Sequence, residues 1–419
     1  MSLVNKIDKK ELNYWDFSDV VSTGIHKISA YPATMVPDMQ NELIKLIKSE
    51  DKSVQNILDP FHGSGVTLVE GMKNDLTPIG IDINPLANLI TLVKLQGVSK
   101  NQIKLSNNRI IDLLRKESFE FEIHDFYNIN KWYREDFIET FSKIRAAIQR
   151  ERYKNIRQYY WVCLINILKK YSNTRSSTFK LHVKTQEDIN SMSNDIIEDF
   201  IKNIENSYVF LPSFVQYDKK KLYIGKAEDM LSEFADGTVD LICTSPPYGD
   251  NSTTVTYGQY SILPLYWIDK SDLGKFDEQL IANYSSIDSN SLGGNQRVRS
   301  SFESSVLNDF LYRIDEKKQN KVKNFVLDYL NVMTELVRVL KMGKYIVLTL
   351  GDRRVDNRVV PLSAITTEYL ESNGFILEKM ITRNIPKKRM PRKVSKVGGN
   401  SVESMNQEHV LILKKVENR

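Results

Sequence analysis

The chain has 419 residues, and its hydrophobic fraction of 41% is enough to build the cores of two or three soluble domains. Its formal charge is only +5, from 58 Lys and Arg against 53 Asp and Glu, so a contact with nucleic acid must rest on local basic patches. The two cysteines, Cys163 and Cys243, lie outside any CxxC spacing, which argues against a disulfide framework and against a zinc site. No apolar run is long enough for a membrane span, and residues 1–11 are charged without an apolar core, so we expect a cytoplasmic protein with no membrane segment.

The first patterned segment is a loop, residues 24–38, that leads into an amphipathic stretch from Met39 to Ile47. Apolar residues recur there at helical spacing, and Pro37 with Asp38 is typical of a helix start. The sequence predicts a loop followed by a helix, and a surface loop that merely caps a sheet is the alternative.

A strand, a glycine-containing turn and a helix are predicted over residues 54–71. Gly63 and Gly65 permit close approach of a ligand to the backbone, and the helix N-terminus after them faces the carboxyl edge of a parallel sheet. The turn is not a phosphate loop, because no Gly-Lys-Ser/Thr follows, and Leu68 stands where the dinucleotide fingerprint has its third glycine.

A second strand, Pro78 to Asp82, ends in an acid. In nucleotide-binding sheets an acid at this place, about 20 residues past the glycine turn, accepts hydrogen bonds from ribose hydroxyls. Asp82 is therefore the predicted ribose partner. The alternative is a cap for the helix that starts near Pro85, although Asn84 already supplies that cap.

Residues 100–215 have few glycines and carry aromatic residues at spacings of three and four, which predicts a mostly helical insertion with the aromatic residues in its core. Within it, residues 169–184 mix basic, aromatic and hydroxyl side chains, including Asn173, Arg175 and Lys180. Such side chains bind phosphates and base edges, so this run is a candidate DNA contact. A solvated basic loop is the alternative.

The strand pattern resumes at Lys221 to Ile224 and again at Val239 to Cys243. The first of these strands precedes Asp229, which could accept a bond from an adenine amino group or from the methionine end of a cofactor, or simply favour a helix N-terminus. The second runs into Thr244-Ser-Pro-Pro-Tyr248. Proline restricts its own φ and the residue before it, so Ser245 and Pro246 should present acceptors to a planar, amino-bearing ligand beside the Tyr248 ring.

The last third of the chain begins with a Ser, Asn and Gly-rich stretch, predicted as a mobile 270–320 loop or lid, with a flexible linker as the alternative. A helix over 322–340, stopped by Gly343, and a buried strand over 345–350 should follow. Strands over 375–382 and 409–413 are predicted to be antiparallel. Between them, residues 383–396 carry seven Lys and Arg and no acid, which favours contact with a phosphate backbone over a merely solvated face.

Three of these features together resemble the amino-group DNA methyltransferases that use S-adenosylmethionine. They are Asp59-Pro-Phe-His-Gly-Ser-Gly65, Thr244-Ser-Pro-Pro-Tyr248, and Tyr31-Pro32 with Pro37 before a helix. The resemblance spans residues 20–98 and 220–419 and leaves out the insertion. In that family the glycine turn holds the methionine part of the cofactor, the acid after the second strand holds its ribose, and the Pro-Pro-Tyr motif holds a flipped-out base.

The resemblance implies S-adenosylmethionine as the cofactor, double-stranded DNA as the substrate and no metal. It implies cofactor contacts from Tyr31, Thr34, Asp59, Pro60, Phe61, Gly63, Ser64, Gly65, Asp82, Ile83 and Asp229. It implies catalytic roles for Ser245, Pro246, Pro247 and Tyr248. The predicted DNA contacts are Asn173, Arg175, Lys180, Lys387, Lys388, Arg389 and Arg392.

Within that family, Ser before Pro-Pro-Tyr resembles the N4-cytosine enzymes, whereas Asp or Asn there resembles the N6-adenine enzymes. We therefore expect a site-specific cytosine-N4 DNA methyltransferase of a restriction-modification system, accompanied by a restriction endonuclease. An N6-adenine enzyme is the alternative, ahead of an RNA or protein-glutamine methyltransferase and of a non-catalytic DNA-binding protein. Methylation at cytosine C5 would need a cysteine nucleophile in a Pro-Cys setting, and Cys243 is followed by Thr244.

The expected fold is α/β, a Rossmann-like seven-stranded mixed sheet of the S-adenosylmethionine-dependent methyltransferase type with a mostly helical insertion. We expect the cofactor-binding half in residues 1–99, the insertion as a target-recognition region in 100–215, and the base-binding half in 216–419.

Overall fold

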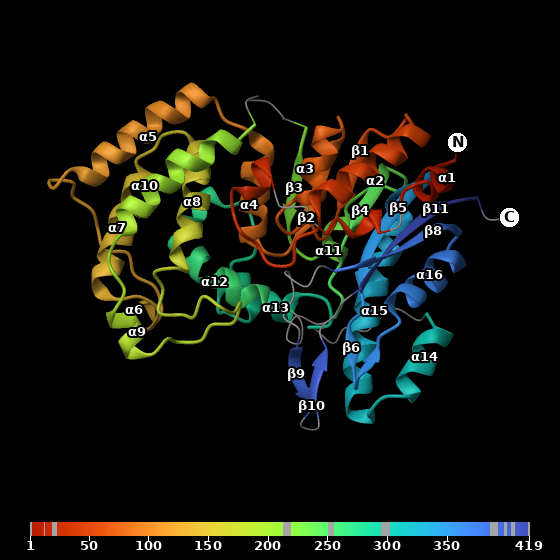
Figure 1. Cartoon of the computed structure of the whole chain (residues 1–419). Coiled ribbons are helices and arrows are strands. Elements are labelled where there is room, and N and C mark those ends of the chain that lie inside the picture. Colours follow the sequence, from red (N-terminus) through yellow and green to blue (C-terminus); the bar gives the residue numbers. More distant parts are fainter. Residues whose placement is uncertain are drawn as a thin grey trace.

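The computed structural model describes residues 2–11, 13–18, 23–212, 219–249, 255–294, 302–385, 393–397, 400–403 and 407–417. These residues form a twisted sheet covered by helices on both faces, with a lobe of helices beside it (Figure 1). Among the described residues, no helix is both long and apolar enough to cross a membrane.

The central sheet has seven strands in the order β3-β2-β1-β4-β5-β11-β8. Strand β11 is antiparallel to both of its neighbours, and the pairs among β1 to β5 are parallel. The predicted α/β fold with a mixed seven-stranded sheet is confirmed, as is the antiparallel pairing near the C-terminal end. The strands are β1 (Asn56–Asp59), β2 (Thr77–Asp82), β3 (Lys221–Ile224), β4 (Val239–Thr244), β5 (Leu340–Gly351), β8 (Phe375–Asn384) and β11 (Gln407–Lys415).

Successive strand residues pack against opposite faces of the sheet, as the period of two requires. On β1, Ile57 joins the core under α2 and Leu58 joins the core under α15. The helices and turns packed around the sheet are α1 (Leu3–Asp8), η1 (Tyr14–Asp16), η2 (Gly24–Lys27), α2 (Pro37–Glu50), α3 (Val66–Lys73), α4 (Pro85–Gln96), α11 (Ala227–Ser232), α15 (Glu316–Val339) and α16 (Leu362–Ser372). Helix α2 begins at Pro37, and Asn84 caps α4, both as predicted.

The insertion folds as a helical lobe whose aromatic residues are its core. Phe137, Phe141 and Trp161 are fully buried there, which confirms that the aromatic stripes are core. Helices α4 and α12 (Tyr257–Trp267) pack against α8, so the lobe and the sheet share one apolar cluster. The lobe consists of α5 (Lys100–Arg115), α6 (Ile129–Trp132), α7 (Glu135–Gln149), α8 (Lys154–Leu168), α9 (Gln186–Asn190), α10 (Ile196–Ser207) and η3 (Tyr208–Phe210).

Much of the stretch predicted as a 270–320 loop is helical in the structure. It contains η4 (Lys270–Asp272), η5 (Glu278–Ile281), α13 (Ser286–Asn290), α14 (Ser305–Tyr312) and the start of α15. Ile281, Ile287, Leu307 and Phe310 are buried, so apolar residues in a polar stretch suffice to hold these short helices. Mobility of a lid here stays a prediction.

Gly343 does not stop the long helix, contrary to the prediction. Helix α15 ends at Val339, and the chain passes directly into β5 at Leu340, which pairs with Val239. Gly343 has a φ of +77° inside β5, next to a shift of register between β4 and β5, so its role is to form a bulge. Two small hairpins, β6 (Arg354–Val355) with β7 (Arg358–Val359) and β9 (Lys393–Val397) with β10 (Asn400–Glu403), complete the fold.

Candidate active site at the carboxyl edge of the sheet

The ends of β1 and β4 are joined by a hydrogen bond between side chains. Thr244 Oγ1 donates to Asp59 Oδ1 over 2.7 Å, and the backbone N–H of Phe61 donates to the same oxygen over 3.1 Å. Thr244 directly precedes Ser245, and Phe61 lies in the glycine turn. One buried carboxyl therefore fixes the Ser-Pro-Pro-Tyr motif against the glycine turn.

The Asp59 side chain supports the turn, since it is fully buried and bonded to protein groups. Its predicted contact with a cofactor stays a prediction. Burial raises the pKa of Asp59 to about 6, and the Thr244 hydrogen bond only partly opposes this. Its second oxygen, Oδ2, has no hydrogen-bond partner among the described residues, which also favours the protonated carboxyl.

This buried carboxyl gives a prediction about stability against pH. The folded-state pKa of Asp59 lies above the unfolded value, so its contribution to stability is greatest at low pH and is lost as the pH rises through 6. In Asp59→Asn, the amide oxygen can still accept the hydrogen bonds from Thr244 and Phe61, but the side chain no longer titrates. We expect the free energy of unfolding of wild type, relative to the variant, to fall by about 2 kcal/mol between about pH 4.5 and 7.5 in urea denaturation. A difference that does not vary with pH would contradict the assignment.

The glycine turn is held by the acid at the end of β2. The Gly63 N–H donates to Asp82 Oδ2 and the Asn84 N–H donates to Oδ1, each over 2.8 Å. Gly63 and Gly65 have φ values of +49° and +76°, and a Cβ on Gly65 would lie 2.6 Å from the Thr91 side chain. Gly65 therefore has no room for a side chain, and the turn lies directly beside the half-exposed carboxylate of Asp82.

A buried lysine on α4 supports the same turn. Lys94 on α4 is 1% exposed, and its Nζ donates to the carbonyl of Ser64 over 2.7 Å. Burial lowers the pKa of Lys94 to about 7. Sequence reasoning missed this residue, because a single lysine on a helix usually indicates a solvated face.

Tyr31 lies at the turn, but its closest neighbours come from α12. Its ring stacks on Tyr257 with centroids 5.9 Å apart and meets Tyr260 edge-on at 5.7 Å. Asn84 Nδ2 donates to the Tyr31 hydroxyl over 3.0 Å and to Ser261 Oγ over 2.7 Å. Tyr257 and Ser261 were not predicted, because only the packing of α12 on α4 brings them to this edge.

The Ser-Pro-Pro-Tyr motif follows β4, the central strand, and its two hydroxyls bond to each other. Ser245 Oγ and Tyr248 Oη are 2.8 Å apart, and the Tyr248 hydroxyl also lies 3.4 Å from Glu408 Oε1 on β11. Burial, with a smaller effect of the Glu408 carboxylate, raises the pKa of Tyr248 well above its usual value. The hydroxyl therefore keeps its proton and can donate.

The other predicted cofactor residues are placed less uniformly. Thr34 and Asp229 are exposed, and Phe61 and Ile83 are half-buried, whereas Pro60 and Ser64 are buried. Asp229 lies in the first turn of α11, after a strand whose end is tied to β2 by the bond from Gly225 N–H to the Asp82 carbonyl. The structure thus brings Tyr31, the glycine turn and Asp82 together and leaves Asp229 on the surface beyond them.

Two of the predicted DNA-binding residues lie on an exposed loop after α8. Arg175 and Lys180 are exposed there, and a bridge between Thr174 and Val183 closes the loop. Asn173 is 5% exposed, and its Nδ2 donates to the Lys131 carbonyl over 3.2 Å, so its predicted DNA contact stays a prediction. It holds the loop to the lobe.

The basic 383–396 run is only partly described. Lys387, Lys388, Arg389 and Arg392 lie outside the described residues. Arg383, the first residue of the run, is 3% exposed and paired with Glu408 over 2.6 Å.

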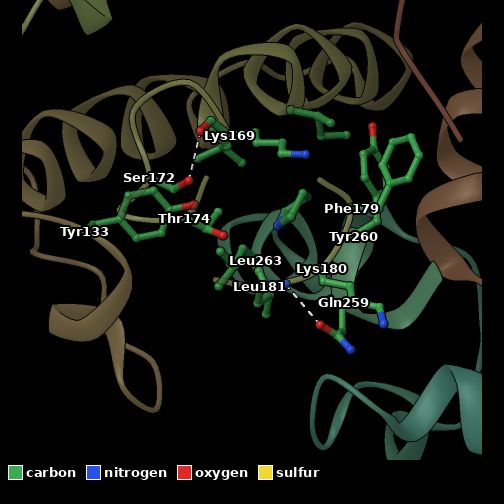
Figure 2. Close-up of a pocket in the computed structure, with 13 residues that line it drawn as sticks. Tyr133, Lys169, Ser172, Thr174, Phe179, Lys180, Leu181, Gln259, Tyr260 and Leu263 are labelled. Atoms are coloured by element: carbon green, nitrogen blue, oxygen red, sulfur yellow. Dashed lines mark hydrogen bonds between the residues drawn. The ribbon is translucent and has the colours of Figure 1, made fainter. Parts of the chain in front are cut away.

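A recess lies between the basic loop and α12 (Figure 2). Leu181 N–H donates to Gln259 Oε1 over 3.0 Å, and the Phe179 ring meets Tyr260 edge-on at 6.0 Å. Its volume of about 30 Å³ holds only one or two waters, so it is no base or cofactor site. What it shows is that the loop tip is anchored to Tyr260, which in turn contacts Tyr31.

No group of three or more His, Cys, Asp or Glu that could hold a metal occurs in the part of the chain that the structure describes. Cys163 and Cys243 are both buried and free. Burial raises the pKa of the Cys243 thiol, which makes it a poor nucleophile.

No family model matches the chain. Over its full length it is similar to the type II methyltransferase M.MvaI of Kocuria varians, with 28% identity over 451 residues, 100% of this chain and 98% of that protein. It is 37% identical over 93 residues to the type II methyltransferase M.MjaII of Methanocaldococcus jannaschii, covering 22% of this chain and 16% of that protein. A candidate DNA modification methylase from Thermus thermophilus, solved with S-adenosyl-L-methionine, matches with a TM-score of 0.24 and 17% identity over 46% of this chain and 55% of that one. That structural similarity is too low to support a conclusion, whereas the similarity to M.MvaI extends over the whole chain.

Proposed function

We propose that this chain is an S-adenosylmethionine-dependent DNA methyltransferase that methylates the exocyclic N4 amine of a flipped-out cytosine. The full-length similarity to a type II methyltransferase supports the general class. The observation that carries the proposal is the hydrogen bond between Thr244 and Asp59, which sets the Ser-Pro-Pro-Tyr motif beside the glycine turn. A methyl-transfer reaction needs the site of the methyl donor and the site of the acceptor base to lie side by side.

The residues at the glycine turn fit the proposed cofactor. Asp82 is half-exposed and held by two backbone N–H groups, so its carboxylate can accept bonds from ribose hydroxyls. The Tyr31 ring lies beside Gly63, and it stacks on Tyr257, so the two rings offer an apolar surface near the turn. When bound, the cofactor supplies a methyl group on a positively charged sulfur, which is the electrophile of the reaction.

The motif after β4 fits a planar amine. An amino nitrogen conjugated to a ring has little lone-pair density, so acceptors on its N–H groups must favour a tetrahedral nitrogen. Ser245 is half-exposed, and its Oγ can act as such an acceptor next to the Pro246 carbonyl. The Tyr248 ring is the stacking partner for the base, and its interaction offsets the few kcal/mol that unstacking costs.

Serine before Pro-Pro-Tyr supports cytosine N4 rather than adenine N6 as the methylated atom. Methylation at cytosine C5 is disfavoured, because it needs a cysteine nucleophile and Cys243 is fully buried within β4. The reaction therefore proceeds without a covalent enzyme intermediate, and the chain's contribution is positioning and desolvation.

Duplex DNA is proposed to contact the lobe through Arg175 and Lys180 on the exposed loop, with the basic residues 387–392 as a second contact. Lys and Arg bind phosphates without sequence preference, so these contacts would supply affinity that weakens with salt. The type II class of M.MvaI further supports a restriction-modification system with a cognate endonuclease.

Nucleoside mass spectrometry of DNA from cells that express the protein tests the proposed function. We expect N4-methylcytosine in this DNA, and much less of it in cells that express Ser245→Ala. N6-methyladenine without N4-methylcytosine would overturn the choice of base. A labelled-methyl assay across DNA, RNA and protein would overturn the DNA assignment if the label appeared only in RNA or at protein glutamine.

A further inference from the structure

We propose that Glu408 is a positioning residue that sets the direction of the hydrogen bonds made by Ser245. This inference rests on the proposed function, since it concerns the same site. Glu408 lies on β11, 163 positions beyond Ser245 in the sequence, and reaches the motif because β11 is inserted beside β5. No sequence motif indicates it.

The three side chains form a continuous series of hydrogen bonds. Ser245 Oγ and Tyr248 Oη are 2.8 Å apart, and Tyr248 Oη lies 3.4 Å from Glu408 Oε1. The other carboxylate oxygen, Oε2, accepts from Arg383 Nη1 over 2.6 Å. Glu408 thus has one oxygen toward the motif and one toward a fixed cation.

Arg383 cannot turn away from Glu408 without losing further bonds. Its Nε donates to the Trp15 carbonyl over 3.0 Å and its Nη2 donates to the Asp16 carbonyl over 2.9 Å. The side chains of Arg383 and Glu408 are 4% and 17% exposed. The pair is therefore largely shielded from solvent, and the guanidinium fixes the position of the carboxylate.

The charge on Glu408 decides which hydroxyl donates. A carboxylate only accepts, so the Tyr248 hydroxyl gives its one proton to Glu408. Ser245 must then donate its own proton to Tyr248 Oη, because that oxygen has no second proton to give. Both lone pairs of Ser245 Oγ remain free to accept from the amino group of the base. Without Glu408, Tyr248 could donate to Ser245 and occupy one of these lone pairs.

Glu408→Gln is the variant that separates direction from packing. The Gln side chain has the same shape, but the donors of Arg383 hold its oxygen, which leaves its NH₂ group facing Tyr248. The amide then donates to Tyr248 Oη, so that the Tyr248 hydroxyl donates to Ser245 and the direction of the hydrogen bonds is reversed. We expect kcat for DNA methylation to fall on the order of tenfold to a hundredfold, with KM for DNA and Kd for S-adenosylmethionine within about twofold.

A double-mutant cycle with Tyr248→Phe completes the test. Phenylalanine keeps the stacking ring and removes the hydroxyl that links Glu408 to Ser245. Glu408→Gln should therefore cause no further loss of kcat in that background. Glu335→Gln is the matched control: it removes a half-buried carboxylate from Arg338, at 2.6 Å, far from the motif, and should leave kcat unchanged. Thermal unfolding shows whether Glu408→Gln folds. If it does not fold, a loss of kcat in Tyr248→Phe with unchanged DNA affinity still tests the role of the hydrogen bonds between Glu408, Tyr248 and Ser245.

Two results would overturn the role of Glu408. One is a wild-type kcat in Glu408→Gln, and the other is an equal loss of kcat from this change in the wild-type and Tyr248→Phe backgrounds. In either case the wild-type enzyme would still methylate DNA. Failure of the wild type itself to methylate DNA contradicts the proposed function as well, so the two failures are distinguishable.

Discussion

The Ser245→Ala enzyme is expected to lose on the order of a hundredfold in kcat for methyl transfer to DNA, because it loses an acceptor that matters most in the transition state. Its Kd for S-adenosylmethionine should stay within about twofold of wild type, since Ser245 is bonded to Tyr248 and not to the glycine turn. Single-turnover methylation of duplex DNA and calorimetric titration of the cofactor measure the two quantities.

Ser372→Ala is a suitable control for the loss of a serine hydroxyl. Ser372 Oγ donates to the Tyr369 carbonyl over 2.7 Å at the end of α16, away from the candidate site. This variant should keep the wild-type kcat. An equal loss of turnover and of cofactor affinity in Ser245→Ala would show that Ser245 belongs to the cofactor site instead.

Replacing Asp82 with asparagine is expected to weaken S-adenosylmethionine binding on the order of a hundredfold, the largest change in affinity that the structure suggests. The carboxylate accepts from the N–H groups of Gly63 and Asn84, and the NH₂ group of asparagine would face one of these donors. The variant loses the ribose acceptor and the support of the glycine turn together. With saturating cofactor, kcat should fall by less than about tenfold.

Asp277→Asn serves as the matched control for Asp82. Asp277 also accepts a backbone N–H, that of Gln279 over 3.0 Å, but it is exposed at the start of η5. The affinity of Asp277→Asn for S-adenosylmethionine should equal that of wild type. Cofactor affinity in Asp82→Asn close to wild type would contradict the predicted ribose contact.

The strands and helices of the sheet region were predictable, because each strand is a short apolar run bounded by turn residues. The strands ending at Asp59, Asp82 and Thr244 were found in this way. The end of the long helix could not be predicted, because its apolar periodicity continues through Leu340. Only pairing with Val239 makes Leu340 the start of a strand.

Within the site, the motifs were predictable and their support was not. The 169–184 run was chosen for its mix of basic, aromatic and hydroxyl side chains and the 383–396 run for its charges. Asn173 and Arg383 within these runs are nevertheless buried and held by partners far away in the chain. Lys94 and Glu408 lie in sequence that carries no motif. Their roles depend on contacts with the Ser64 carbonyl and with Tyr248, which come from packing between elements far apart in the chain.

The position of β11 has a consequence for synthesis of the protein. It is the last strand in chain order, yet it lies between β5 and β8 and pairs with both. In a growing chain on the ribosome, β5 and β8 therefore lack their shared partner until residues 407–415 emerge. Glu408 arrives with the same strand. A nascent chain that already displays the glycine turn and the Ser-Pro-Pro-Tyr motif thus acquires the support of its motif only after residues 407–415 have emerged.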